Sequence, residues 1–291
     1  TSQYRTSDGC GMSVHALPSG KVYVRKDVAE VWAGQDIMQA AFDLNGEIFR
    51  DVPGRRTMRV HLGSTTYFVK LHYGVGWSEI LKNWMQLKWP VLGASNEYEA
   101  CSRLLEAGIA APIPAAYAES KGSIAKRRSF ILSDELAGYS SLEDVTDSWP
   151  QQPPTLHHRR SMLKAVASFA KKFHDSGFIH RDFYICHLLA NDRALADGHI
   201  ELAVLDLHRA RQFAMVPKRW LKRDLAALLF SSMDLGFSRR DWLRFLRLYT
   251  GQPLAQVLGE HADFWQAVVT RAEKLYDEGL RKGTVKGIYR S

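Results

Sequence analysis

The pattern of the sequence changes from strand-like to helical near Ala137 and Gly138, and this change limits the folds that the chain can adopt. Before it, the runs EIFRDV, RTMRVHL and TTYFVKLH follow one another from Gly46 with turn residues between them, which predicts an antiparallel meander. After it, apolar residues recur at helical spacing, which predicts helices at about 155–176, 217–235, 239–250 and 261–281. SSLE, from Ser140, offers a capping box at the start of this helical half. The order predicts an α+β protein.

One helix is expected in the strand-rich half, at 95–107, where Gly108 ends it. At about 100° per residue, Glu97 points inward beside the apolar face of this helix, and Glu99 faces water.

The chain divides by pattern into three parts: a flexible tail at 1–20, a first lobe at 21–137 and a helical lobe at 138–291. Within the first lobe, 74–93 carries Trp, Ile and Leu at helical spacing beside lysines, which predicts a basic amphipathic insertion. The apolar face of this insertion either packs on its own domain or contacts a membrane surface or an acidic partner.

Composition excludes several classes of protein. With 291 residues and 46% hydrophobic composition, the chain can bury a large core. No apolar run is long enough to span a membrane, and the first residues contain no apolar signal segment. Three cysteines without a CxxC pair give no disulfide framework or zinc ribbon, which favours a reducing cytosol. A net charge of +8 favours a polyanionic partner, namely nucleic acid, an anionic membrane surface or a phosphorylated glycan.

Four charged features follow one another in the order of a protein kinase. Lys70 ends a strand, Glu97 lies on the next clear helix, HRD occupies 180–182, and Asp206 ends the strand of ELAVLDLH. This order predicts a bilobal protein-kinase-like fold, with an antiparallel-sheet N-lobe holding one inward helix and a mainly helical C-lobe.

Phosphoryl transfer explains why these residue types are needed. Asp182 can accept the proton of an acceptor hydroxyl, so it is the candidate catalytic base. Lys70 can hold the α and β phosphates of ATP while Glu97 fixes it by an ion pair. Asp206 is a hard oxygen ligand suited to Mg²⁺.

Two further residues of this region are expected to be structural. Arg181 is expected to pair with a nearby acid, and Asp224 is either a helix N-cap or a brace for the catalytic loop. Apolar residues of the loop are expected to anchor it in the C-lobe core: Phe183, Ile185, Leu188 and Leu189.

The sequence departs from a protein kinase at two points. His187 stands five residues after Asp182, where a kinase has its metal-binding Asn, so either His187 is a softer second ligand or another group completes the site. The G-x-G-x-x-G loop is absent, and Gly54 with Arg55 or Arg56 in DVPGRRTMRV is expected to contact the phosphates instead.

Rival sites fit the residues poorly. Cys186 and His187 are neighbours that point to opposite faces of an extended segment, which excludes a thiol nucleophile with its own base. The sequence contains no HExxH or comparable paired histidines for zinc.

Seven segments together resemble one family, the WaaP/RfaP lipopolysaccharide core heptose(I) kinases. They are GRRTMRV, YFVKLHYGVGWSEILKNW, PVLGASNEYEA, SFILSDEL, HRDFYICHLL, LDLHRA and PKRWLKRDLAALLFS, and the resemblance runs from about Val24 to Tyr276. Because the family shares Tyr-Ile-Cys-His after HRD, His187 resembles a family feature.

The resemblance implies ATP-dependent, Mg²⁺-dependent phosphorylation of the first heptose of the lipopolysaccharide inner core, at the cytoplasmic face of the inner membrane. It carries over Asp182 as base, Lys70 and Glu97 as the ATP pair and Asp206 as metal ligand. Glu135 and Leu136, after the last N-lobe strand, are also expected at the ATP site. Protein-tyrosine kinase activity is implied as secondary.

A cluster of basic residues after Asp206 either binds an anionic acceptor or is a solvated helix start. Its members are Arg209, Arg211, Lys218, Arg219, Lys222 and Arg223. The partners expected are the lipopolysaccharide inner core, an anionic inner-membrane surface and an acidic acyl carrier protein, and no nucleic acid.

Two other functions stay open. One is a protein kinase or another small-molecule kinase, against which the short stretch between Asp206 and the next helix argues. The other is a catalytically dead binding module, against which the retention of Lys70, Asp182 and Asp206 argues.

Overall fold

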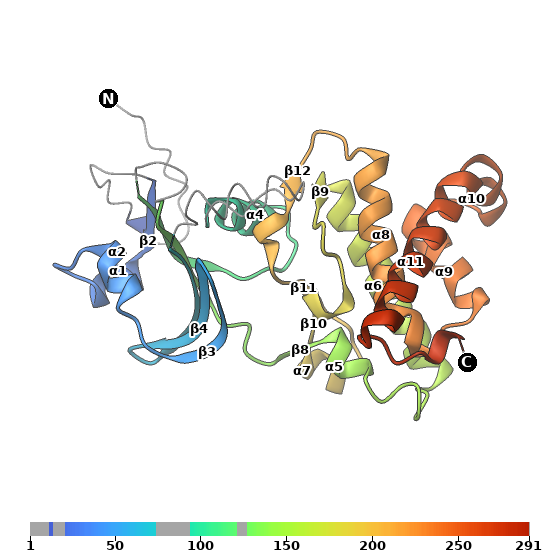
Figure 1. The fold of residues 1–291 in the computed structure, drawn as a ribbon, viewed down its shortest axis with the longest axis horizontal. Helices are drawn as coiled ribbons and strands as arrows, with labels where there is room; N and C mark the ends of the chain where they lie inside the picture. The colour runs from blue at the N-terminus through green and yellow to red at the C-terminus, as the bar shows by residue number, and fades with distance from the viewer. Residues whose placement is uncertain (1–11, 14–20, 74–93, 121–126, 291) are drawn as a thin grey trace. The chain divides into compact units, whose positions relative to one another are not determined.

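The computed structural model describes residues 12–13, 21–73, 94–120 and 127–290, and the chain divides into two compact units (Figure 1). The N-lobe unit runs to Ser102 and includes Pro112–Glu135, and the C-lobe unit comprises Arg103–Ala111 and the chain from Leu136. The boundary therefore lies between Glu135 and Leu136, close to the position predicted from the sequence, and the last residues of α4 (Ser95–Glu106) with the five residues after it belong to the second unit. The predicted insertion at 74–93 lies outside the described residues.

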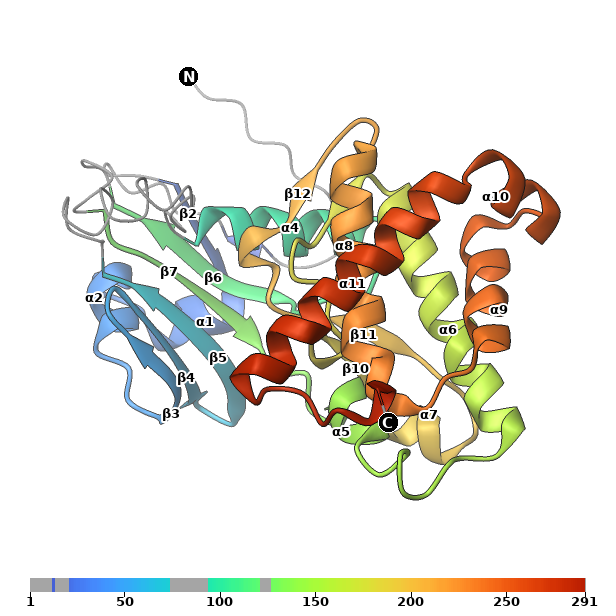
Figure 2. The ribbon, with the colours of Figure 1, turned by 45° about the vertical axis from the view of Figure 1, so that its right-hand side comes forward.

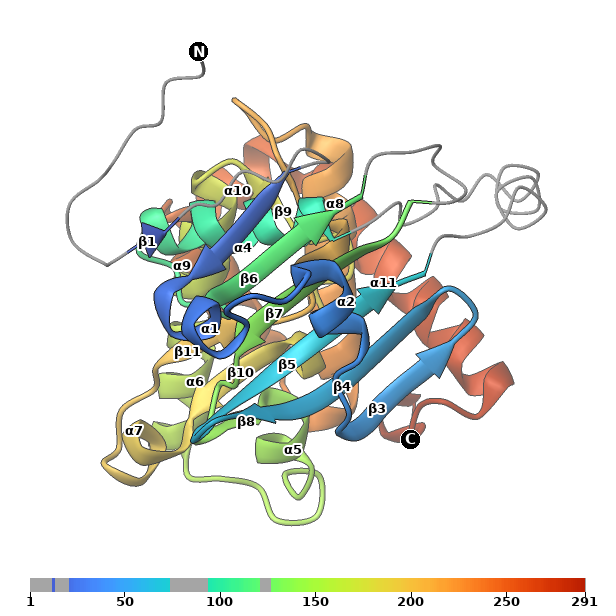
Figure 3. The ribbon, with the colours of Figure 1, turned by 90° about the vertical axis from the view of Figure 1, so that its left-hand side faces the viewer.

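Among its described residues, the N-lobe unit contains a seven-stranded antiparallel sheet in the order β1-β2-β6-β7-β5-β4-β3 (Figure 3). The strands are β1 (Met12–Ser13), β2 (Val22–Arg25), β3 (Glu47–Val52), β4 (Arg55–Leu62), β5 (Thr65–His72), β6 (Pro114–Glu119) and β7 (Ser129–Asp134). β3, β4 and β5 are the three strands of the predicted meander, which is confirmed. β1 falls within the predicted tail and pairs with β2.

Helices lie on both faces of this sheet (Figure 3). α4 (Ser95–Glu106) packs on one face, where Tyr98 stacks on Tyr117 of β6. α1 (Lys26–Val31) and α2 (Ile37–Phe42) cover the other face, where Val69 and Leu71 of β5 belong to the main N-lobe core.

The expectation of a single N-lobe helix is therefore wrong. α1 and α2 contain six residues each, so neither repeats its apolar positions over enough turns to show a helical period. Val28 of α1, Trp32 directly after α1 and Ala41 of α2 are buried in the core of the sheet. Tertiary packing, more than local propensity, explains these two helices.

Helices dominate the C-lobe unit (Figure 2). They are α5 (Leu142–Thr146), α6 (Leu156–Asp175), α7 (Asp192–Ala196), α8 (Lys218–Ser232), α9 (Arg239–Thr250), α10 (Leu254–Glu260) and α11 (Ala262–Lys282). The four long helices predicted from the sequence correspond to α6, α8, α9 and α11. The short helices α7 and α10 were not predicted. α5 begins one residue later than the predicted capping box, because Ser141 and not Ser140 caps it.

Two small antiparallel sheets carry the central loops of the C-lobe unit. β8 (Tyr139–Ser141), β10 (Leu188–Asn191) and β11 (Leu202–Val204) form one, and β9 (Phe178–Ile179) and β12 (Arg211–Gln212) form the other. The HRD segment therefore lies between β9 and β10, and Asp206 follows β11.

Buried apolar side chains anchor the HRD loop in the core of the C-lobe unit. Phe183 is fully buried and stacks on Phe173 of α6, with ring centroids 5.3 Å apart. Ile185, Leu188 and Leu189 are also buried, as predicted. Among the described residues, no helix is both long enough and apolar enough to cross a bilayer.

Candidate active site

The N-lobe unit brings together Lys70, which was predicted to hold the ATP phosphates, and Glu97, which was predicted to fix Lys70 by an ion pair. Lys70 alternates with Val69 and Leu71 along β5, so its side chain lies on the face of the sheet that α4 covers. Its Nζ is 2.5 Å from Oε1 of Glu97, and Glu97 is only 4% exposed. The prediction that Glu97 points inward is confirmed, as is the exposure of Glu99.

Three further residues predicted to contact ATP, Gly54, Arg55 and Arg56, lie in the turn between β3 and β4 and at the start of β4. Gly54 adopts φ 80° in the turn between β3 and β4, a conformation that favours glycine, and its carbonyl accepts the backbone N–H of Tyr73 at 3.0 Å. Arg56 lies 2.8 Å from the Asp51 carboxylate. Arg55 is half-buried at the start of β4.

Glu135 and Leu136 stand on either side of the boundary between the units. The Glu135 carboxylate lies 2.9 Å from Nε of Arg59, so a protein partner already occupies it. Leu136 is half-buried.

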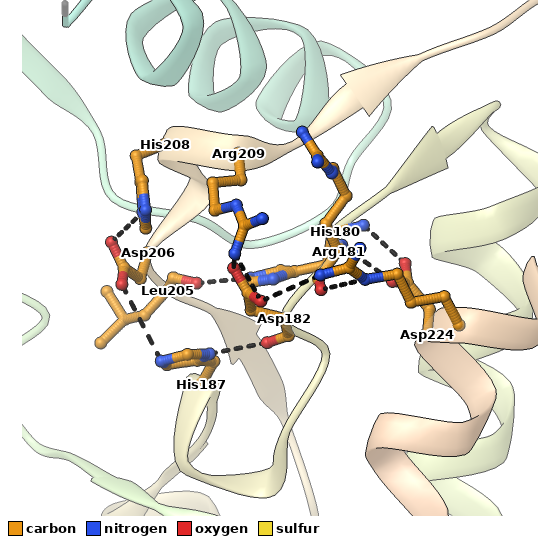
Figure 4. A network of polar contacts seen from close by, with 10 residues as sticks. His180, Arg181, Asp182, His187, Leu205, Asp206, His208, Arg209 and Asp224 are labelled. Atoms are coloured by element: carbon orange, nitrogen blue, oxygen red, sulfur yellow. Dashed lines mark hydrogen bonds and ion pairs between the residues drawn. The ribbon is translucent and has the colours of Figure 1, made fainter. Parts of the chain in front are cut away.

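Asp224 holds the backbone of the HRD loop in the C-lobe unit (Figure 4). Its two carboxylate oxygens accept the backbone N–H groups of His180, at 2.6 Å, and Arg181, at 2.8 Å. Asp224 is completely buried within α8, so the brace interpretation is confirmed and the N-cap interpretation is wrong. The ring Nε2 of His180 bonds the carbonyl of Leu205 at 2.7 Å, which ties the loop to the segment that ends in Asp206.

The Arg181 side chain does not follow its prediction. Its guanidinium lies 5.0 Å from the ring centroid of Trp220, and among the described residues no acid forms an ion pair with it. Burial, together with Arg209, Arg223 and Arg211, lowers the pKa of Arg181 to about 10. The expected acid partner is therefore replaced by an aromatic face within a group of arginines.

Asp182, the predicted catalytic base, contacts two residues that were predicted to bind the acceptor (Figure 4). Nη1 of Arg209 lies 3.0 and 2.9 Å from its two carboxylate oxygens. Nη2 of Arg223 lies 3.9 Å from Oδ1, while Nε of Arg223 donates to the carbonyl of Arg181 at 3.1 Å. Arg223 therefore also supports the loop.

His187 and Asp206 are arranged as two potential ligands of one cation (Figure 4). Nδ1 of His187 bonds the backbone carbonyl of Asp182 at 2.7 Å, and a carbonyl can only accept, so Nδ1 carries the hydrogen. The lone pair of Nε2 is then available, 3.9 Å from Oδ2 of Asp206. Within the described residues, no group of three or more His, Cys, Asp and Glu side chains could hold a metal. Two ligands suit Mg²⁺, which keeps water and phosphate oxygens in its other positions.

His208 is a site residue that the sequence interpretation missed. Its Nδ1 lies 2.7 Å from Oδ1 of Asp206, the oxygen on the other side from His187. Asp206 itself has φ 57°, which is unusual for a residue with a side chain. The sequence offered one indication of this contact: His208 is a histidine two residues after Asp206, the predicted metal ligand.

The remaining basic residues are distributed over β12 and the start of α8. Arg211, Lys218 and Arg219 are exposed, and Lys222 is half-buried. Arg219 lies 5.7 Å from the centroid of Trp220. Trp220 was not singled out in the sequence, although it stands among these arginines.

Cys186 is not arranged as a nucleophile. Burial raises the pKa of its thiol to about 11, which keeps it protonated at neutral pH. The exclusion of a cysteine nucleophile agrees with this environment.

Comparison with known proteins identifies the family. Residues 39–249 match the model of the lipopolysaccharide kinase (Kdo/WaaP) family. Lipopolysaccharide core heptose(I) kinase WaaP of Pseudomonas aeruginosa is 41% identical over 264 residues, which cover 90% of this chain and 98% of that protein. The protein of the same name from Escherichia coli K12 is 36% identical over 263 residues, 90% of this chain and 99% of that protein.

A solved structure agrees with the fold. The structure of WaaP in complex with acyl carrier protein superposes with a TM-score of 0.76 at 37% identity, covering 88% of this chain and 99% of that chain. The predicted protein-kinase-like α+β fold is confirmed. The extent of the family match and the similarity to full-length relatives show that this chain belongs to the lipopolysaccharide kinase (Kdo/WaaP) family.

Proposed function

We propose that this chain is a lipopolysaccharide core heptose(I) kinase, which transfers the γ-phosphoryl group of ATP to the first heptose of the inner core. The observation that carries this proposal is the match to heptose(I) kinases over 98% and 99% of their length, at up to 41% identity. Retention of Lys70, Glu97, Asp182 and Asp206 in kinase order supports an active enzyme and argues against a binding module.

The proposed reaction assigns a task to each charged group. The acceptor oxygen forms a bond to the γ-phosphorus while the bond from that phosphorus to the β–γ bridging oxygen breaks, and its electron pair leaves with ADP. Asp182 accepts the proton of the acceptor hydroxyl. Lys70, held by Glu97, neutralises negative charge on the phosphates.

We assign Mg²⁺ to Asp206 and His187. One carboxylate oxygen and one imidazole nitrogen fit an ion that takes its other ligands from phosphate and water. When bound, the ion would neutralise charge on the phosphates. The bond from His208 to Asp206 orients the carboxylate for this purpose.

The acceptor is proposed to lie beside the start of α8. Arg211, Lys218 and Arg219 are exposed there, and phosphate or carboxylate groups of an inner-core glycan would be attracted to them. Between Asp206 and α8, which begins at Lys218, the chain forms a 3-10 turn (Leu207–Arg209) and β12. A long regulatory segment does not fit in this stretch, which favours a glycan over a regulated protein substrate.

We further propose an acyl carrier protein as a partner and the cytoplasmic face of the inner membrane as the place of action. A solved relative is in complex with acyl carrier protein, and the net charge of +8 suits an acidic protein or an anionic membrane surface. Co-purification with acyl carrier protein at low salt tests the first interaction, and sedimentation with vesicles containing anionic lipid tests the second. Absence of either interaction at low salt would contradict that part of the proposal.

The kinase proposal is tested with labelled ATP, Mg²⁺ and heptose-bearing core lipopolysaccharide that lacks phosphate on the first heptose. Wild-type protein should label the glycan, and Asp182→Asn should reduce that labelling at least about 100-fold. Asp197→Asn, which changes an exposed aspartate of the same unit, is the matched control and should keep full activity. Label on protein alone would favour a protein kinase, and no ATP turnover by folded protein would favour a binding module.

A further inference from the structure

The Arg209–Asp182 ion pair raises a question about catalysis. One nitrogen of the Arg209 guanidinium contacts both oxygens of the carboxylate that the proposed reaction uses as base, at 3.0 and 2.9 Å (Figure 4). An acceptor hydroxyl needs one of these oxygens at hydrogen-bond distance to deliver its proton. Arg209 therefore shares, or has to release, the atoms on which the reaction depends.

Of the two arginines that form ion pairs with Asp182, Arg209 and Arg223, Arg209 can change partner at the lower cost. Arg223 is tied to the loop by its bond to the carbonyl of Arg181, and Arg181 packs over Trp220. The hydrogen bonds of the Arg209 side chain among the described residues all go to Asp182, and 33% of that side chain is exposed. Moving it would break a single ion pair.

The surrounding charge favours an anion as the alternative partner. Four guanidinium groups act on one another here, those of Arg181, Arg209, Arg211 and Arg223, and their mutual repulsion contributes to the lowered pKa of Arg181. Asp182 is the carboxylate that ion-pairs with Arg209 and Arg223, while the carboxylate of Asp224 is bonded to backbone N–H groups. A phosphate or carboxylate would add the negative charge that this cluster lacks.

We propose that Arg209 is a specificity-determining residue that exchanges Asp182 for an anionic group of the acceptor, a phosphate or a carboxylate near the reacting hydroxyl. The exchange makes Asp182 accessible to acceptors that carry such a group and keeps it covered against water and neutral sugars. This inference rests on the proposed kinase function and adds to it the chemical class of acceptor that the site selects. A guanidinium suits both anions, because its planar nitrogens match the oxygens of either.

The test compares three acceptors: the native core, which lacks phosphate on the first heptose and keeps its other anionic groups, the same core with its carboxylates converted to methyl esters, and the same core with its remaining phosphates removed. Wild-type protein should prefer the native acceptor by at least about tenfold in kcat/KM over the one that lacks the recognised anion. If kcat/KM falls for the methyl-esterified core, Arg209 binds a carboxylate; if it falls for the core without phosphates, Arg209 binds a phosphate. Equal kcat/KM for all three acceptors would overturn the inference.

Arg209→Ala should abolish this preference, mainly through a higher KM for the native acceptor with little change in KM for ATP. It should also raise ATP hydrolysis without acceptor severalfold, because water then reaches Asp182. Arg209→Lys should keep part of the preference, since it retains the charge without the planar geometry. Arg240→Ala, an exposed arginine on α9, should behave as wild type, and thermal unfolding checks that each variant is folded.

Hydrolysis without acceptor separates this inference from the kinase proposal. If the wild type transfers phosphate to no core acceptor, the proposed function fails. A rise of hydrolysis in Arg209→Ala would then still support the covering of Asp182 by Arg209, whereas the exchange for an acceptor anion would fail together with the proposed function. The inference would be overturned if folded Arg209→Ala kept the wild-type preference among acceptors, or if its ATP hydrolysis without acceptor fell below that of wild type.

Discussion

The carboxylate of Asp224 accepts the backbone N–H of Arg181 at 2.8 Å and so stabilises a left-handed conformation, φ 75°, directly before the predicted catalytic base. That conformation is costly for a residue with a side chain and persists where surrounding contacts support it. The support extends into the core, because His174 of α6 places Nε2 3.6 Å from the same carboxylate and bonds Tyr249 through Nδ1 at 2.9 Å. The direction of Asp182 is thus set from the interior of the helical unit.

We predict that Asp224→Ala lowers both stability and activity. It leaves two backbone N–H groups without acceptors, each at a cost of about 1–3 kcal/mol, and it removes the support of the strained residue. The free energy of unfolding should fall by about 3 kcal/mol, and kcat at least about 100-fold, since small displacements of a catalytic group are costly. Denaturant unfolding and steady-state kinetics measure the two effects.

A matched control for this prediction is Asp241→Ala, another buried aspartate of the same unit, which caps α9 through Ser238. It should lose comparable stability through the lost helix cap, yet keep kcat. Equal losses of kcat in both variants would show that the effect of Asp224 is general destabilisation.

We predict that variants of Lys70 and Glu97 affect stability and activity differently. Lys70→Met leaves Glu97 as a buried carboxylate without its cation, which should cost about 3–5 kcal/mol of stability. The double variant Lys70→Met with Glu97→Gln should recover most of that stability. Both variants should have kcat/KM for ATP at least about 100-fold below wild type, because the cation at the phosphates is lost.

Glu99→Gln, on the exposed face of the same helix, is the control and should match wild type in both measurements. If the double variant regained activity together with stability, the pair would have a structural role alone.

The fold could be predicted where an element is long enough to repeat its pattern. β4 and β5 alternate buried and less buried positions within eight residues each, and α6 and α11 repeat their apolar positions over 20 and 21 residues. α1 and α2 are much shorter, so their apolar residues carry no period and their structure depends on contacts with the sheet. The capping serine of α5 was misplaced by one residue, because two adjacent serines offer the same chemistry.

The site could be predicted where function fixes the spacing within a motif, as for Asp182 and His187. Contacts made by charges far apart in sequence could not be predicted in the same way. Arg209 is 27 residues from Asp182, and nothing in the sequence of either residue specifies the other as partner. For the same reason, Arg181 was expected to meet an acid and meets Trp220.

We predict an acid-dependent loss of stability in the N-lobe unit. Asp27 bonds Arg25 at 2.8 Å and accepts from Tyr67 at 2.9 Å, and chiefly the Arg25 bond lowers the pKa of Asp27 from 3.8 to about 2. The folded pKa is below the unfolded one, so this stabilisation is present above about pH 4 and is lost as the pH falls towards 2.

Asp27→Asn should therefore show a smaller decrease in melting temperature between pH 4 and pH 2 than wild type, although it is less stable at pH 7. Asp197→Asn should keep the wild-type slope. A wild-type slope in Asp27→Asn would mean that other carboxylates account for the acid sensitivity.

The last prediction concerns His187, whose two ring nitrogens have different tasks. Nδ1 bonds the carbonyl of Asp182, and Nε2 faces Asp206. If Nε2 is a ligand, His187→Ala should raise the Mg²⁺ concentration for half-maximal activity by about tenfold or more, because a site with two protein ligands loses one. Activity is measured over a Mg²⁺ titration at saturating ATP and acceptor.

The same titration distinguishes a ligand from a support of the loop. A residue that only positions Asp182 through its carbonyl would lower kcat at saturating Mg²⁺ and leave the half-maximal concentration unchanged. His187→Asn provides the comparison, since an amide oxygen is a harder ligand for Mg²⁺ than an imidazole and stands at this position in protein kinases. It should restore the Mg²⁺ dependence at least to that of wild type. Because the amide is shorter than the ring, recovery of Mg²⁺ dependence without full recovery of kcat would assign metal binding to Nε2 and positioning of the loop to Nδ1.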